Sequence, residues 1–172
     1  MPEVSEGELT IDFGVVKLSG KLSEQDRQCA WQLYTEMVTR VAVSGKRRDD
    51  SCTDFSGEIM AESLESLHAF FREARNIMKS FPVGKLKEKN QRHLGIFIHD
   101  LLADVIRPFL EEWQADFRSW WERQDRSERS WFDLQKSYPR HGELIGQWTR
   151  LRKLMRSMEK ELREQYKLQG VG

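Results

Sequence analysis

The sequence predicts a mainly α-helical fold, a single-domain bundle of about four long helices with a short N-terminal extended segment. Four stretches place apolar residues at alternating steps of three and four, which puts those residues on one face of a helix. Only one short stretch alternates with the period of two expected of a strand. Polar connections of roughly ten residues or fewer join the four long stretches, which suits helices packed against one another.

The composition favours one soluble domain. The 172 residues are enough for a sizeable core, and the 28 basic and 28 acidic residues cancel. A neutral chain argues against a dedicated nucleic-acid binder and favours association with other proteins. No apolar run approaches the roughly 18 residues of a membrane span. We therefore expect a cytoplasmic protein with no membrane partner, in which Cys29 and Cys52 are reduced.

Residues 1–21 are expected to form an extended arm, residues 22–168 the bundle and residues 169–172 a flexible tail. The strand pattern of the arm rests on Leu9, Ile11, Phe13 and Val15. A lone strand leaves donors and acceptors unpaired. The arm would therefore fold back at Gly14 as a hairpin, pair with another chain or remain a flexible tail.

The first two long helices are expected at residues 23–43 and 57–80. Ser23 offers an N-cap to the first, and Ser56 or Thr53 offers one to the second, after a polar linker. The first helix has a single apolar face, formed by Ala30, Leu33, Tyr34, Met37, Val38 and Val41. The second has a wider one, which includes Met60, Leu64, Leu67, Phe71, Ala74 and Met78.

The third long helix is expected at residues 92–122, with Pro108 in its middle. A proline deprives the carbonyl four residues back, here that of Asp104, of its donor, so we expect a kink or a break. A polar stretch, a short helix at 130–137 and a last helix at 141–168 follow. The last helix carries a narrow apolar seam of Trp148, Leu151, Met155, Met158 and Leu162.

No catalytic or metal-binding motif is present. The four histidines include no pair at the spacing of three or four that puts two ligands on one helical face, and the Glu-x-x-His spacing occurs once, at Glu65 and His68. The sequence contains no phosphate loop and no nucleophile elbow. We therefore expect neither a cofactor nor a metal, and a protein that is not an enzyme.

Charge is distributed unevenly between the last two long helices. Residues 100–128 hold eight acidic residues against four arginines, and residues 140–167 hold eight basic residues against four glutamates. The two helices are either antiparallel neighbours whose rims attract, or the basic face meets an acidic partner or nucleic acid. Aromatics also cluster between residues 113 and 148, and the excess is typical of a protein–protein hot spot.

Three strings resemble helical proteins of bacterial conflict loci. They are AWQLYTEMVTR at 30–40, SLESL with FFREAR within 63–75, and IRPFL followed by Trp113 at 106–113. Gln114 and Ala115 depart from the family pattern, which has a histidine-proline pair there. The resemblance implies an accessory or adaptor role in anti-phage defence, beside caspase-like or TPR-containing components.

The sequence thus predicts an adaptor or regulatory subunit that works by protein–protein interaction. Its expected partner is another protein, such as a defence effector, and it can also form a homo-oligomer. The alternative is a subunit that senses nucleic acid or nucleotide through its basic last helix. The candidate interaction residues are Arg107, Trp113, Trp120, Trp121, Trp131, Arg152, Arg156 and Arg163.

Overall fold

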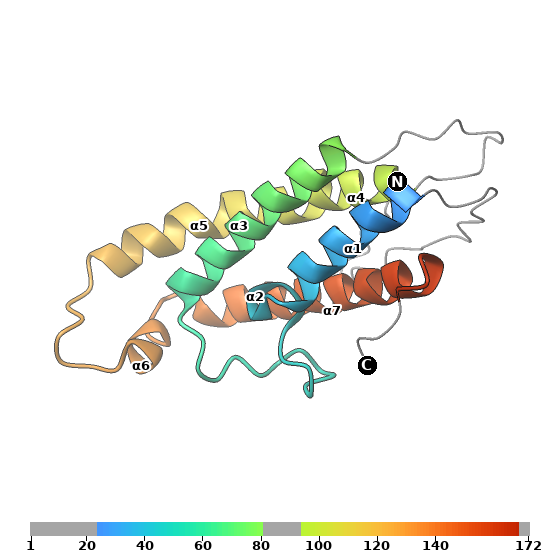
Figure 1. Cartoon of the computed structure of the whole chain (residues 1–172). Helices are drawn as coiled ribbons and strands as arrows, with labels where there is room; N and C mark the ends of the chain where they lie inside the picture. Colours follow the sequence, from blue (N-terminus) through green and yellow to red (C-terminus); the bar gives the residue numbers. More distant parts are fainter. Residues whose placement is uncertain (1–23, 81–93, 169–172) are drawn as a thin grey trace.

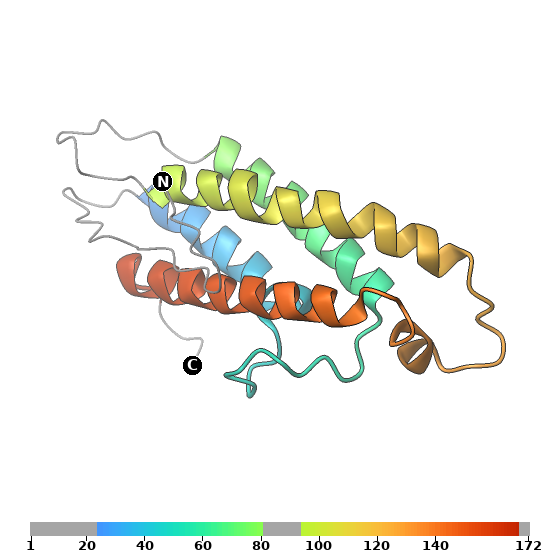
Figure 2. The ribbon, with the colours of Figure 1, turned by 180° about the vertical axis from the view of Figure 1, so that it is seen from behind.

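Four long helical rods run alternately up and down in two layers (Figures 1 and 2). The computed structural model describes residues 24–80 and 94–168. The predicted strand at 9–15, the arm and the tail lie outside these residues. The elements are α1 (Glu24–Val38), α2 (Val41–Ser44), α3 (Met60–Lys79), α4 (Leu94–Leu101), η1 (Leu102–Ile106), α5 (Arg107–Glu122), α6 (Trp131–Gln135) and α7 (His141–Gln165).

One layer holds α1 and α3, and the other holds α7 and the rod made of α4, η1 and α5 (Figures 1 and 2). The core between them is rich in large aromatic side chains. Trp113, Phe117 and Trp148 are each 0% exposed. The rings of Phe109 and Trp148 meet edge to face with their centroids 5.4 Å apart, which joins α5 to α7. The predicted mainly helical bundle is confirmed.

The predicted first helix, 23–43, is wrong in one respect, because it divides in two. α1 ends at Val38, and Arg40 adopts an extended backbone with φ −111° and ψ 108° before α2 begins. The Thr39 hydroxyl donates to the Thr35 carbonyl at 2.6 Å, and such side-chain bonds compete with helix continuation. The Trp148 indole then donates to the Ala42 carbonyl at 2.7 Å, which ties α2 to α7.

Of the kink or break expected at Pro108, the break does not occur. The turn before it, η1, is π-helical, and the Arg107 N–H donates to the Leu102 carbonyl five residues back. Pro108 therefore lies in the first turn of α5, where a backbone N–H has no partner to lose. Figure 2 shows the rod continuing through this turn. The π-helical turn thus accommodates Pro108, which has no backbone N–H to donate, without a break in the rod.

α3 begins at Met60, not at Gly57, and neither Ser56 nor Thr53 caps it. The Met60 N–H instead donates to Oε1 of Gln135, on α6, at 2.8 Å. A residue 75 positions away thus satisfies a first-turn donor of α3.

The acidic and basic helices, α5 and α7, are antiparallel neighbours (Figure 2). Among the described residues, ion pairs between the two helices lie at the end where α7 begins. Arg140, the residue before α7, reaches Glu112 at 2.7 Å and Asp116 at 3.4 Å on α5. The expectation of attracting rims is confirmed there.

Candidate functional site

A groove of about 960 Å³ runs along the outer surface between α3 and the rod of η1 and α5. We call it the α3–α5 groove. Its floor is apolar and consists of Phe71, Met78, Leu102, Ala103 and Leu110. The sequence places these side chains together because Phe71 and Met78 are two turns apart on α3, as are Ala103 and Leu110 on the facing rod.

The walls of the α3–α5 groove are positively charged. Arg75 and Lys79 come from α3, and Arg107 and Arg118 from α5, against a single lining carboxylate, that of Glu111. Such a surface is complementary to a negatively charged ligand with apolar groups.

Three of these four cations make contacts at the surface. The Arg107 Nε donates to Glu111 Oε1 at 2.7 Å, and this hydrogen bond raises the pKa of Arg107 above its ordinary value. Arg118 lies 3.6 Å from Glu65 on α3. The Arg75 guanidinium lies over the Phe71 ring, 5.6 Å from its centroid. Both ion pairs are exposed, so a ligand carboxylate can exchange with Glu111 or Glu65 at little cost.

His68 and His99 also line this groove, from α3 and α4. The sequence did not predict that they share one surface. His99 Nδ1 lies 3.6 Å from Asp100.

The candidate tryptophans divide by burial. Trp113 and Trp121 are 0% and 5% exposed, so neither offers a surface, which corrects the sequence prediction for both. The Trp113 indole donates to Gln147 on α7 at 2.9 Å, and Trp121 stacks on Phe117. They are buried because α5 packs this face against the core. Trp120 is partly buried against the core.

Trp131 remains a surface candidate, with 43% of its area exposed. The Arg126 guanidinium lies 5.6 Å from the Trp131 ring centroid and 5.8 Å from that of Trp121. This cation already covers part of the ring. Trp131 is therefore a small aromatic patch at the end of the bundle, separate from the α3–α5 groove.

The candidate arginines of α7 also differ in burial. Arg152 is 0% exposed, and the prediction that it belongs to a free basic face is wrong. Its Nη2 donates to Glu58 Oε2 at 2.6 Å, and its guanidinium lies 4.0 Å from the Phe55 ring centroid. Burial of a charge requires such a partner, and Glu58 supplies it.

Arg156 is also largely used inside the molecule. Its Nε donates to the Ser44 carbonyl at 2.7 Å and its Nη2 to the Lys46 carbonyl. Of the candidate arginines on α7, Arg163 alone remains exposed. The basic face that the sequence predicts is thus smaller in the structure.

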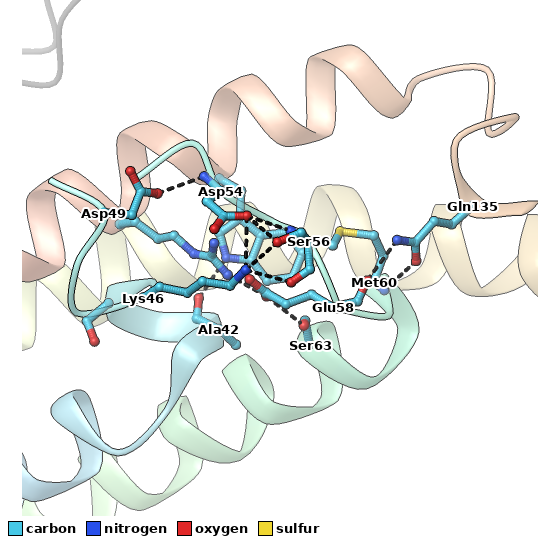
Figure 3. A network of polar contacts seen from close by, with 12 residues as sticks. Ala42, Lys46, Asp49, Asp54, Ser56, Glu58, Met60, Ser63 and Gln135 are labelled. Carbon is cyan, nitrogen blue, oxygen red and sulfur yellow. Dashed lines mark hydrogen bonds and ion pairs between the residues drawn. The ribbon is translucent and has the colours of Figure 1, made fainter. Parts of the chain in front are cut away.

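The contacts of Arg152 and Arg156 form part of a loop network, which we define as residues 42–63 with Gln135, Trp148, Arg152 and Arg156. Figure 3 shows part of it, from Ala42 and Lys46 to Glu58, Ser63 and Gln135. Glu58 also accepts a hydrogen bond from the Ser63 hydroxyl at 3.1 Å, and Gln135 Nε2 donates to the Glu58 carbonyl at 2.8 Å. Glu58 Oε1 and Arg152 Nε and Nη1 have no hydrogen-bond partner among the described residues. Stacking of Arg152 on Phe55 offsets part of that cost.

The outer part of the loop is held by Lys46, which contacts Asp54 at 2.9 Å and the Ser56 carbonyl at 2.7 Å. The Ser56 hydroxyl and Lys46 hold the pKa of Asp54 well below its usual range. Gly45, with φ +73°, ends α2 beside the loop, and an added Cβ there would lie 3.3 Å from Arg152 Cδ. The loop network therefore holds the polar linker between α2 and α3 against α7.

Sequence reasoning missed the groove residues Arg75 and Arg118 and the network residues Glu58 and Gln135. A signal existed for the groove, since His68 and Arg75, like Phe71 and Met78, repeat every seven residues on one face of α3. No local pattern pointed to Glu58 or Gln135, because their partners are far away in sequence.

The described residues define an up-and-down four-helix bundle with a cationic, apolar groove on one side. Comparison with protein-family models, with curated proteins and with solved structures gives no match. Within residues 24–80 and 94–168, no helix is long and apolar enough to cross a membrane, and no cluster of three or more metal-ligating side chains occurs.

Proposed function

We propose that this chain is a non-enzymatic protein-binding module whose α3–α5 groove takes an acidic, apolar segment of a protein partner. The observation that supports the proposal most is the composition of the groove, in which four cations and one carboxylate surround an apolar floor. Burial of apolar side chains on the floor would supply affinity. The cations would select negatively charged segments and orient them.

The dimensions of the groove suit a short segment. Its α3 wall extends from His68 to Lys79, eleven helical steps, which correspond to about 16 Å. That length accommodates about three turns of a helix or about five extended residues. Helices that bind in grooves commonly use anchors over such a span. Arg107, a candidate from the sequence, lies on the opposite wall, at the start of α5.

The alternative function, nucleic-acid or nucleotide sensing through α7, has less support. Arg152 is buried against Glu58, and Arg156 donates to loop carbonyls. Phosphate contacts depend on cations that are free to approach the backbone. Arg163 is exposed, but without Arg152 and Arg156 the basic surface of α7 is smaller than the sequence suggested.

The resemblance to accessory proteins of bacterial anti-phage loci extends the proposal to the identity of the partner. On that resemblance, the partner is a defence effector in the cytoplasm, and the chain acts as its adaptor or regulatory subunit. A homo-oligomer remains compatible with this role.

The proposal is tested with a display library of random peptides of about 14 residues, long enough for the groove as a helix. Peptides selected on the full chain are expected to be acidic, with apolar residues on one face. Their affinity, measured by fluorescence polarisation, should fall at least about tenfold in the double variant Arg75→Glu/Arg118→Glu, since two attractive contacts become repulsive.

The matched control is Arg150→Glu, which reverses an exposed cation on α7 outside the groove. It should leave the affinity within about twofold of the wild type, because a distant exposed charge is screened. Selection of basic peptides, or equal loss in the control and the groove variant, would overturn the proposal. Competition by single-stranded DNA that depends on Arg163 would instead support the alternative.

A further inference from the structure

We propose that residues 8–16 of this chain occupy its own α3–α5 groove when no partner is bound, so that a partner must displace them. This inference rests on the proposed function of the groove and names the way in which it is regulated. Four observations support it: the chemistry of the segment, its attachment point, the chemistry of the other grooves, and the length of the groove.

The chemistry of the segment matches that of the groove. Residues 8–16 contain two acidic side chains, those of Glu8 and Asp12, and no lysine or arginine. Within them, apolar residues alternate at Leu9, Ile11, Phe13 and Val15. In an extended segment these four side chains lie on one side, so they can face Phe71, Met78 and Leu110 together. The acidic residues then lie between walls that carry Arg75, Lys79, Arg107 and Arg118.

The attachment point of the segment is at one end of this groove. In the first turn of α1, Gln25 Nε2 donates to the Ser80 carbonyl at 3.4 Å. Ser80 follows Lys79, which lines the groove. Eight residues, 16–23, separate the apolar segment from α1, and they can span up to about 26 Å, which exceeds a helix diameter of about 10–12 Å. The segment can therefore cross α3 and enter the groove.

Two other grooves fit the segment less well. The groove beside α2 and α7, about 520 Å³ in volume, carries four cations, but Val38 is the single large apolar side chain among the described residues that line it. The outer groove between α1 and α3, about 510 Å³ in volume, is lined by Glu36 and Glu73 and by no cation among the described residues. An acidic segment is repelled there. The connection at 81–93, also close to the α3–α5 groove in sequence, carries four basic residues against one glutamate. Its charge has the same sign as the groove walls, which disfavours it as the occupant.

The apolar part of the segment is slightly longer than the groove, so it can fill the groove along its whole length. Residues 9–15 in an extended conformation span about 20 Å, against about 16 Å for the wall from His68 to Lys79. Covalent attachment through a short linker gives an effective concentration in the millimolar range. Even a weak contact would therefore keep the groove filled until a tighter partner arrives.

Disulfide cross-linking in the full chain tests the placement. Phe13→Cys combined with Met78→Cys, on the groove floor, should form an intramolecular disulfide at least about tenfold faster than Phe13→Cys with Trp131→Cys, on the Trp131 patch. The native Cys29 and Cys52 are buried. Equal rates for the two pairs would overturn the inference. A cross-linked dimer whose yield rises with concentration would assign the groove to a second copy instead.

Hydrogen exchange measures occupancy without new cysteines. Amides of residues 9–15 should exchange at least about tenfold more slowly in the wild type than in Arg75→Glu/Arg118→Glu, because occupancy of the groove protects them. Arg150→Glu should resemble the wild type. If residues 9–15 exchange as fast in the wild type as in Arg75→Glu/Arg118→Glu, the inference is contradicted.

A third measurement separates this inference from the proposed function. The variant Ile11→Asp/Phe13→Asp should bind the library-selected acidic peptides about tenfold more tightly than the wild type, since the intramolecular competitor is lost. Unchanged tight binding would refute self-occupancy and leave the groove function intact. If no peptide binds either protein while cross-linking to Met78→Cys succeeds, the partner-binding function fails and the internal contact stands.

Discussion

The loop network and the α3–α5 groove both contain arginines, and they use them in opposite ways. In the network Arg152 is fully buried and bound to Glu58, and Arg156 donates to two backbone carbonyls. In the groove Arg75, Arg107 and Arg118 remain at the surface. The comparison shows that an arginine count along a helix does not identify a binding face. A buried guanidinium closes the fold, whereas an exposed one above an apolar floor is held by surface contacts and stays accessible.

The largest expected effect is at the buried pair. Arg152→Met should lower the free energy of unfolding by about 3–5 kcal/mol, because it leaves the Glu58 carboxylate buried without its cation. Urea denaturation measures this loss. The double variant Arg152→Met/Glu58→Leu should recover part of it, since no unpaired charge remains. A loss below about 1 kcal/mol would show that the network does not close the fold.

Gln135→Ala should have the second largest effect. Its amide group serves both the Met60 N–H and the Glu58 carbonyl, each at 2.8 Å and in a buried setting. Loss of both partners should cost about 2–3 kcal/mol of unfolding free energy. The exposed Gln25→Ala, on α1, is the matched control and should cost less than about 0.5 kcal/mol. Equal values for the two variants would contradict the remote capping of α3.

A smaller effect concerns pH. Burial lowers the pKa of His141 below 6.5, so the unfolded chain binds this proton more readily than the folded one. The free energy of unfolding should therefore be unaffected by this group above pH 6.5 and should fall as the pH drops below it. Thermal unfolding between about pH 7 and pH 5 measures the slope. His141→Gln should flatten it, and an unchanged slope would assign it to other groups.

The smallest effect on stability is expected at the groove. Arg75→Glu/Arg118→Glu should change the free energy of unfolding by less than about 0.5 kcal/mol, because both side chains are exposed and the Arg118 ion pair with Glu65 is a surface pair. The same variant should lose peptide binding. Destabilisation comparable to that of Arg152→Met would remove the contrast between the two regions.

Most of the fold could be predicted from the sequence. The apolar faces of residues 57–80 and 141–168 gave α3 and α7 nearly in full, since an amphipathic periodicity reports local geometry directly. The failures at Arg40, Met60 and Pro108 share a cause. In each, the rule did not include a neighbouring element: α7 with Trp148 for α2, α6 with Gln135 for α3, and the π-helical turn η1 directly before Pro108.

The candidate site was predicted in part. Arg107 and Trp131 are at the surface, as a role in binding requires, while Trp113, Trp121 and Arg152 are buried. Adjacent aromatics such as Trp120 and Trp121 point in different directions, so the sequence alone could not tell which one the core would take. Whether the exposed candidates bind a partner stays a prediction.

The sequence by itself determined that this chain forms a helical bundle with one acidic and one basic long helix, because periodicity and charge are properties of single elements. Only the tertiary structure decided which cations are free, because that depends on which helix faces another. It brought Arg75 beside Arg107 over an apolar floor and placed Arg152 against Glu58. Side chains far apart in sequence acquire a common function only once the helices are packed.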